Sequence, residues 1–113
     1  MKTSELTEAA LDWAVAKCEG LLHDDGTVSD YWQPSELWEQ GGPIIERECI
    51  SVGLNESSAH EHTKYTAAMV DTTTTPWTPL AWLCGSTPLI AAMRCYVASK
   101  LGDEVEIPQQ LNT

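Results

Sequence analysis

The residues best suited to binding chemistry lie in the middle of the chain, where two glycines precede a proline and a single arginine. Gly41 and Gly42 lead into Pro43, which favours the first turn of a helix, and Arg47 follows one turn later. Glycines permit close backbone approach, free N–H groups at a helix start attract anions, and a guanidinium binds phosphate or carboxylate at two points. The pattern is neither a P-loop nor a dinucleotide fingerprint, so a turn with an Arg47 salt bridge stays an open alternative.

Tryptophan is the second candidate for ligand contact, since the chain has five tryptophans and no phenylalanine. Flat aromatic rings stack on bases and similar rings. We therefore predict a site for a planar, anionic ligand, lined by Trp32, Trp38, Gly41, Gly42, Arg47, Trp77 and Trp82. The alternative is that these tryptophans only fasten loops onto the core. We expect Trp13 to be a core residue at the edge of the apolar stripe of its helix.

The sequence indicates neither catalysis nor a metal site. His60-Glu61-His62 fits a surface loop better than a pair of metal ligands. The four cysteines lack Cys-x-x-Cys spacing, so we expect free thiols and no metal at Cys18, Cys49, Cys84 and Cys95. No Ser/His/Asp or Cys/His pattern stands out. We expect no enzyme and no cofactor, with a small nucleotide-processing enzyme as the weakest alternative.

The charge of the chain limits its partners. Seventeen acidic and six basic residues give a net charge of −11, and residues 18–46 hold seven acids without Lys or Arg. Direct binding to duplex nucleic acid is disfavoured because phosphate contacts need a basic surface. The acids either keep the protein soluble or compete with nucleic acid for a basic partner. Residues 1–5 lack the apolar core of a signal peptide and no apolar run could span a bilayer, so we expect a cytoplasmic protein.

Two helices must position these residues. An amphipathic pattern predicts the first over residues 6–18, with Thr7 as N-cap and Gly20 as stop. The second, over residues 88–101, has Thr87 as N-cap, Pro88 at its first position and Gly102 as C-cap. We expect its apolar stripe to consist of Ile90, Met93, Val97 and Leu101.

The remaining segments predict a small sheet. We expect a helical turn from Pro43, then strands over residues 49–54 and 65–70, an apolar segment 80–84 beneath the second helix, and a strand at 105–107. Residues 20–42 are too interrupted for a long helix, although the turn at 25–26 permits a short hairpin. The sum is an α+β fold, with two main helices packed on a small, mainly antiparallel sheet. We assign one compact domain to residues 1–108 and a frayed tail to 109–113.

The second helix carries a face of small residues around a single arginine. Ala91, Arg94 and Ala98 lie one turn apart, so another backbone can approach closely there. This face packs either on the sheet or against a second copy of the chain, and we predict it as the interface of a possible homo-oligomer. Arg94 then needs an acidic partner.

Three blocks of sequence together resemble the NinX-like family of small phage proteins, a family of unknown function found in lambdoid phages and prophages. The blocks are residues 5–17, from Glu-Leu-Thr to Ala-Val-Ala-Lys, residues 41–48, Gly-Gly-Pro-Ile-Ile-Glu-Arg-Glu, and residues 87–105, which begin Thr-Pro-Leu-Ile-Ala-Ala-Met-Arg. The resemblance implies a phage context without an established activity or catalytic residues. The family pattern has glycine where this chain has Cys49, which implies an altered turn.

A small phage protein without catalytic motifs is expected to act by binding a host component in the host cytoplasm. The leading interpretation is a binding protein that captures a small nucleotide-like host signal and so blunts antiviral defence. The alternative is an acidic inhibitor that mimics nucleic acid and blocks a basic host protein. The tryptophans and Arg47 favour the first interpretation, and the net charge of −11 favours the second.

Overall fold

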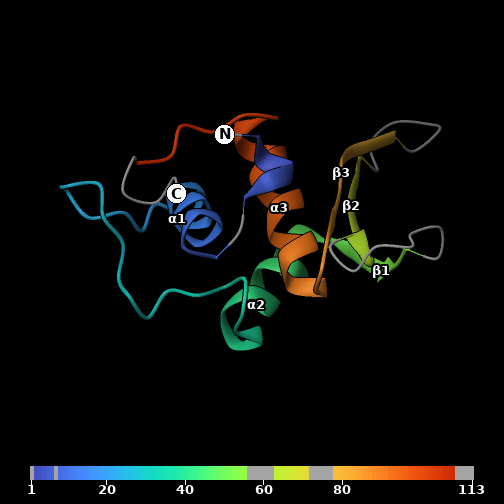
Figure 1. Ribbon diagram of the computed structural model, residues 1–113. Coiled ribbons are helices and arrows are strands. Elements are labelled where there is room, and N and C mark those ends of the chain that lie inside the picture. Colours follow the sequence, from blue (N-terminus) through green and yellow to red (C-terminus); the bar gives the residue numbers. More distant parts are fainter. Residues whose placement is uncertain (1, 7, 56–62, 72–77, 109–113) are drawn as a thin grey trace.

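The fold is α+β, as predicted, and it is built around one central helix (Figure 1). The computed structural model describes residues 2–6, 8–55, 63–71 and 78–108. Within them lie a 3₁₀ helix, three α-helices and a three-stranded sheet. In chain order, the bounds are η1 (Thr3–Glu5), α1 (Glu8–Glu19), α2 (Trp38–Glu48), β1 (Ser51–Leu54), β2 (Tyr65–Asp71), β3 (Thr78–Gly85) and α3 (Pro88–Leu101). Thr7 and the tail 109–113 lie outside the described residues.

Helix α3 has the boundaries and caps that its sequence predicts. Pro88 is its first residue, the Thr87 hydroxyl accepts a hydrogen bond from the Ile90 amide at 3.1 Å, and Gly102 closes the helix at φ +86°. The predicted apolar stripe is too narrow, because almost every residue from Leu89 to Val97 is buried. Figure 1 shows the reason: the sheet covers α3 on one side, and α1 and α2 cover it on the others.

The sheet is antiparallel throughout, with strand order β1-β2-β3. Ala67 of the central strand lies opposite Val52 of β1 and Leu83 of β3. Ala67 and Met69 alternate as buried residues because one face of β2 packs against α3. The predicted strand at 65–70 is therefore confirmed, and the apolar segment 80–84 belongs to β3.

Helix α2 corrects the prediction for the glycine pair. The helix begins at Trp38 instead of Pro43, so Gly41 and Gly42 lie within it, and the Gly41 amide already donates to the Leu37 carbonyl at 2.9 Å. Gly41 serves packing: a Cβ atom there would lie 2.5 Å from the Pro34 carbonyl oxygen and 2.7 Å from a Leu89 methyl group. The glycine brings α2 close to α3 and leaves no anion cradle at this position.

Two further strand predictions are wrong. Residues 105–107 form no strand, and Glu104 just before them forms an isolated bridge with Lys2. Residues 23–27 form a turn instead of a hairpin, closed by a hydrogen bond of 2.7 Å from the His23 amide to the Thr27 carbonyl. Residues 20–37 contain no strand to extend that turn.

Arg94 lies in the interior and joins three parts of the chain. It is 8 % exposed, its Nε donates to the Leu6 carbonyl at 2.8 Å, and its Nη1 donates to the Cys84 carbonyl at 2.8 Å. Among the described residues Arg94 has no acidic partner of the kind predicted, and backbone carbonyls take that place. Ala91 is also fully buried, against Gly85 of β3. The small-residue face thus packs within its own chain, which leaves Ala91 and Arg94 unavailable for the predicted contact between copies.

We expect Arg94→Ala to lower the free energy of unfolding by about 3–5 kcal/mol, because each hydrogen bond from a charged group contributes about 1.5–3 kcal/mol. Urea denaturation followed by circular dichroism measures this loss. The control is Arg47→Ala, which removes ion pairs at an exposed side chain and should cost about 1 kcal/mol or less. Equal losses in the two variants would contradict the central role of Arg94.

Cys49 supplies a second stability prediction. It ends α2 in the left-handed conformation, with φ 55° and ψ 45°, the conformation that a family glycine would adopt most readily. A side chain there costs about 1–2 kcal/mol, partly offset by the greater unfolded-state freedom of glycine. Cys49→Gly should therefore raise the thermal midpoint, whereas Cys49→Ala should leave it nearly unchanged. A rise in both variants would point to the thiol instead of the backbone.

Candidate functional site

Of the residues predicted to bind a planar anion, the structure describes five, and Gly42 alone lies beside a predicted tryptophan, Trp38. Gly41 is buried between Pro34 and Leu89, whereas Arg47 lies at the far end of α2. Trp32 is half-buried, and Trp38 is 58 % exposed. The backbone of Trp82 pairs with Ala68 in the sheet. Trp77 and the side chain of Trp82 lie outside the described residues.

Arg47 is held by its own chain. Its Nη1 and Nη2 donate to the two carboxylate oxygens of Glu19 at 3.0 and 2.7 Å, and its Nε donates to Glu48 at 2.9 Å. Nη2 also lies 3.2 Å from the Tyr96 hydroxyl, which in turn donates to Glu19. Hydrogen bonds from Arg47 lower the pKa of Glu19 and of Glu48. The salt-bridge alternative for Arg47 therefore describes its position, and each of its nitrogens already has a carboxylate partner.

Two tryptophans fasten the segment 20–37 onto α1. The Trp13 indole donates to the Gly26 carbonyl at 2.8 Å, and the Trp32 indole donates to the Asp12 carbonyl at 3.1 Å. Asp12 also accepts from the Ser35 amide at 2.9 Å through Oδ1. Burial raises the pKa of the Asp12 carboxyl. Trp13 is a core residue as predicted, and Trp32 fits the alternative in which tryptophan anchors a loop.

Sequence reasoning missed Asp12, although a signal was present. Asp12 is the only charged residue between Ala10 and Ala16, in a stretch that is otherwise apolar and fully buried. A buried acid needs hydrogen-bond donors. The hydrogen-bond donor to Asp12 lies more than twenty residues away along the chain. The periodicity of one helix does not identify such a distant partner.

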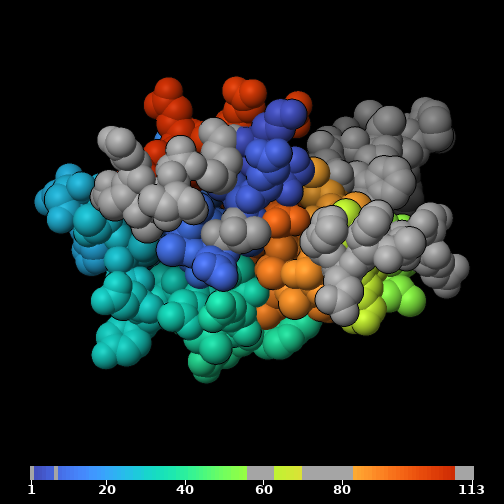
Figure 2. Space-filling model, viewed as in Figure 1, coloured from blue at the N-terminus to red at the C-terminus, as the bar shows by residue number. Residues whose placement is uncertain are grey.

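The segment held by these bonds presents an acidic surface, which we define as Asp24, Asp25, Asp30, Tyr31, Glu36, Trp38 and Glu39. All seven side chains are exposed, and Tyr31 reaches 85 %. Within the described ranges, the ion pairs of the protein involve only Glu19 and Glu48 as acids, so the five carboxylates of this surface are unpaired. The residues before α2, coloured light blue and cyan, form one end of the molecule in Figure 2.

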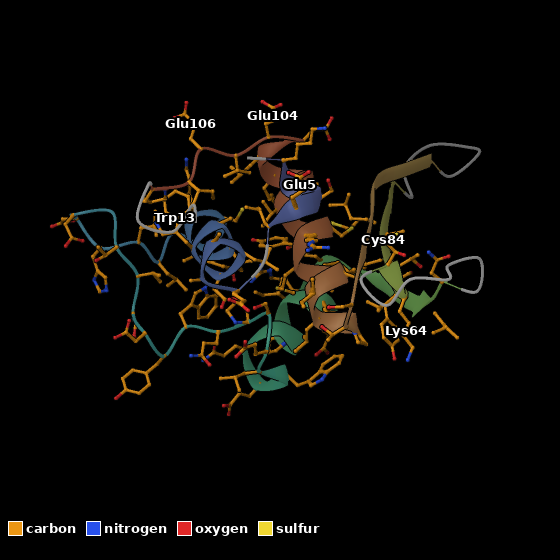
Figure 3. All side chains as sticks on the ribbon, viewed as in Figure 1. Glu5, Trp13, Lys64, Cys84, Glu104 and Glu106 are labelled. Carbon is orange, nitrogen blue, oxygen red and sulfur yellow. The ribbon has the colours of Figure 1, made fainter. Side chains whose placement is uncertain are left out.

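A groove of about 430 Å³ lies between α1 and this segment. We call it the α1 groove. Its wall includes the Trp13 side chain, labelled in Figure 3. Four carboxylates line it, from Glu8, Asp12, Asp30 and Glu36. In the described part of the chain, no three His, Cys, Asp or Glu residues are close enough together to hold a metal ion.

The structure also describes the four cysteines. The four cysteines are free thiols, and Cys49 is the exposed one. Burial raises the pKa of Cys18 and of Cys95 to about 11, which makes these thiols poor nucleophiles at neutral pH. His60 and His62 lie outside the described residues. None of the helices in the described ranges is long and apolar enough to cross a bilayer.

The Glu19–Arg47 pair gives a pH-dependent prediction. The pKa of Glu19 is lowered in the folded protein, so the pair adds stability above the unfolded value near 4.3 and loses it as the pH falls further. The difference in unfolding free energy between the native protein and Glu19→Gln should thus be full at pH 7 and shrink below about pH 4. The control, Glu39→Gln, changes an exposed carboxylate without an ion pair. A difference for Glu19→Gln that is constant between pH 3 and 7 would contradict the assignment.

Comparison with known proteins agrees with the family resemblance of the sequence. No match was found among curated proteins. The model of the family described as "Bacteriophage P22, NinX" matches residues 2–100 and so includes α1, α2, the sheet and most of α3. The NinX resemblance of the sequence is thereby confirmed, and the chain belongs to the NinX family of phage proteins.

Proposed function

We propose that this phage protein is a non-enzymatic binding protein that acts in the host cytoplasm by covering a basic surface of a host protein. The observation that carries the proposal is the acidic surface, whose five carboxylates form no ion pair with a described residue and which also holds two exposed aromatic side chains. The partner best matched to it is a nucleic-acid-binding protein, because its phosphate-binding residues are basic. Occupation of that site would exclude nucleic acid.

The distribution of cations supports this proposal. Arg94 is buried, and Arg47 and Lys100 are paired with Glu19 and Glu48. No Lys or Arg occurs in residues 20–46, so nothing in this segment neutralises its acids. An uncompensated surface of one sign attracts an oppositely charged partner over a distance and raises its rate of association.

The aromatic side chains supply what charge alone lacks. Tyr31 is 85 % exposed and Trp38 is 58 % exposed, although both are large aromatic side chains that a domain core could bury. Tyrosine and tryptophan are enriched among the residues that dominate the binding energy of protein interfaces. Their position among carboxylates fits an interface that has an apolar centre and a charged rim.

Capture of a nucleotide-like anion has less support from the geometry. Arg47 is engaged with carboxylates, the Gly41 amide is engaged with Leu37, and the α1 groove is lined by acids. An anionic ligand would be repelled at that groove. The same arrangement gives no support to a nucleotide-processing enzyme.

Capture experiments from host extract test the proposal. The surface-neutralised variant carries Asp24→Asn, Asp25→Asn, Asp30→Asn, Glu36→Gln and Glu39→Gln. The control variant removes the same number of charges from exposed positions elsewhere, through Glu5→Gln, Glu46→Gln, Asp103→Asn, Glu104→Gln and Glu106→Gln. We expect the native protein and the control to retain a basic protein that added DNA displaces, and the surface-neutralised variant to lose it, because DNA and the acidic surface compete for one site.

The result that contradicts the proposal is equal retention by the two variants, or retention that DNA does not affect. A titration with AMP is the parallel measurement for anion capture. Quenching of tryptophan fluorescence by AMP, abolished by Arg47→Ala, would favour the nucleotide interpretation over the acidic surface.

A further inference from the structure

A second groove lies between the first turns of α2 and α3, at the edge of the acidic surface. Its volume is about 350 Å³, and its lining includes Trp38 of α2 together with Pro88, Leu89 and Ile90 of α3. We call it the α2–α3 groove. Figure 1 shows the start of α3, in orange, beside α2, in green. Because these four side chains consist almost wholly of carbon, the groove offers an apolar surface.

The walls of the α2–α3 groove are held in place by the packing of the two helices. A Cβ atom at Gly41 would lie 2.7 Å from a Leu89 methyl group, and Leu89 is 3 % exposed. On the other helix, the Thr87 hydroxyl fixes the Ile90 amide at 3.1 Å. A groove formed in advance costs little conformational entropy when a ligand enters it.

Trp38 is the exposed part of this groove. Three other large apolar side chains in the described ranges are exposed, Leu21, Tyr31 and Leu54, and none of them lines the groove. An exposed apolar surface beside a concavity is typical of a site where another polypeptide binds, and tryptophan is the residue most enriched at the centre of such sites.

The charge around the α2–α3 groove selects the occupant. Glu36 lines the groove and Glu39 follows Trp38 in the chain; both are exposed, and the described lining holds no Lys or Arg. A second copy of the chain, with its net charge of −11, would set like charges against each other, and nucleic acid would do the same. The groove is thus complementary to a basic polypeptide segment.

We propose that the α2–α3 groove accepts an apolar side chain from a segment of the host protein in which lysine or arginine flanks that side chain. The inference rests on the proposed function and names the chemistry of the segment that the partner supplies. The apolar side chain is buried between Trp38 and the first turn of α3, and the flanking cations lie near Glu36 and Glu39.

The test uses a defined probe, the peptide acetyl-Arg-Lys-Leu-Lys-Arg-amide, titrated into ¹⁵N-labelled full-length protein. A matched peptide has serine in place of leucine, and a third has glutamate at all four flanking positions. We expect the leucine peptide to shift the Trp38 indole N–H resonance and to bind about tenfold more tightly than the serine peptide, the gain from burial of one leucine side chain. The glutamate peptide should not bind.

Two variants assign the preference for leucine to the groove. Trp38→Ala should make the leucine and serine peptides bind equally, and Trp38→Phe should restore most of the difference because an aromatic ring remains. The control is Tyr31→Ala, which removes the other exposed aromatic side chain of the acidic surface, outside the groove, and should leave the preference unchanged.

A measurement on the native protein keeps the test decisive if Trp38→Ala disturbs the start of α2. Nuclear Overhauser contacts from ¹³C-labelled leucine methyl groups of the peptide to the Ile90 methyl groups are expected, because Ile90 lines the groove. Absence of these contacts, equal binding of the serine or glutamate peptide, or a dimer in sedimentation that Trp38→Ala disperses would overturn the inference. The last result would make a second copy the occupant.

The outcome separates this inference from the proposed function. If the leucine peptide shows no preference while the surface-neutralised variant still loses its host partner, the groove assignment is wrong and the acidic surface stands. If the leucine peptide enters the groove but no DNA-displaced partner is captured, the groove binds an apolar side chain and the proposed function is wrong.

Discussion

The fold depends on one buried guanidinium. Arg94 projects from the middle of α3 to two backbone carbonyls, Leu6 at the start of the chain and Cys84 at the end of β3. Burial lowers the pKa of Arg94, which reflects the cost of a charge in the interior. The cost is offset only while both carbonyls are in place, so the N-terminal segment and the end of the last strand must meet beside Arg94 on α3. Figure 1 shows α3 between the sheet and the other helices.

The position of α1 then determines where the acidic surface lies. The segment 20–37 has too few apolar residues to attach itself by burial, and it is held to α1 by hydrogen bonds that involve Trp13, Trp32 and Asp12. Leu22, Val28 and Trp32 of the segment also pack partly against the core. The acids of the segment are exposed, and none of them forms an ion pair with a described residue. A poorly hydrophobic segment can thus be well placed and still be wholly available for contact.

Local signals predicted the parts of the fold that depend on neighbouring residues. Both caps of α3 and the alternation in β2 could be read from the sequence, since a cap needs only adjacent residues and a strand needs only its own period. The start of α2 could not be read from the sequence. Trp38 to Gln40 extend the helix ahead of Pro43, and the helix loses only one backbone hydrogen bond at the proline. Residues 105–107 alternate like a strand, yet they pair with none of the three strands of the described sheet.

The candidate site was harder to predict because its chemistry depends on distant pairs. The sequence left Arg47 open between anion binding and a salt bridge, because its carboxylate partner Glu19 lies 28 residues away. Asp12 and Ser35 are 23 residues apart. The excess of acids between residues 18 and 46 was visible from the start, and only the fold showed which of those acids stay unpaired.

Charge by itself would make this protein an unselective partner for any basic surface, and screening by salt would weaken it. The same fold that removes Arg47, Arg94 and Lys100 from the acidic surface also exposes Tyr31 and Trp38 on it. For the proposed basic partner, long-range attraction would set how fast it arrives, whereas aromatic contacts would set how long it stays. Selectivity among host proteins would therefore come from these few aromatic contacts, and the carboxylates would contribute mainly to the rate of encounter.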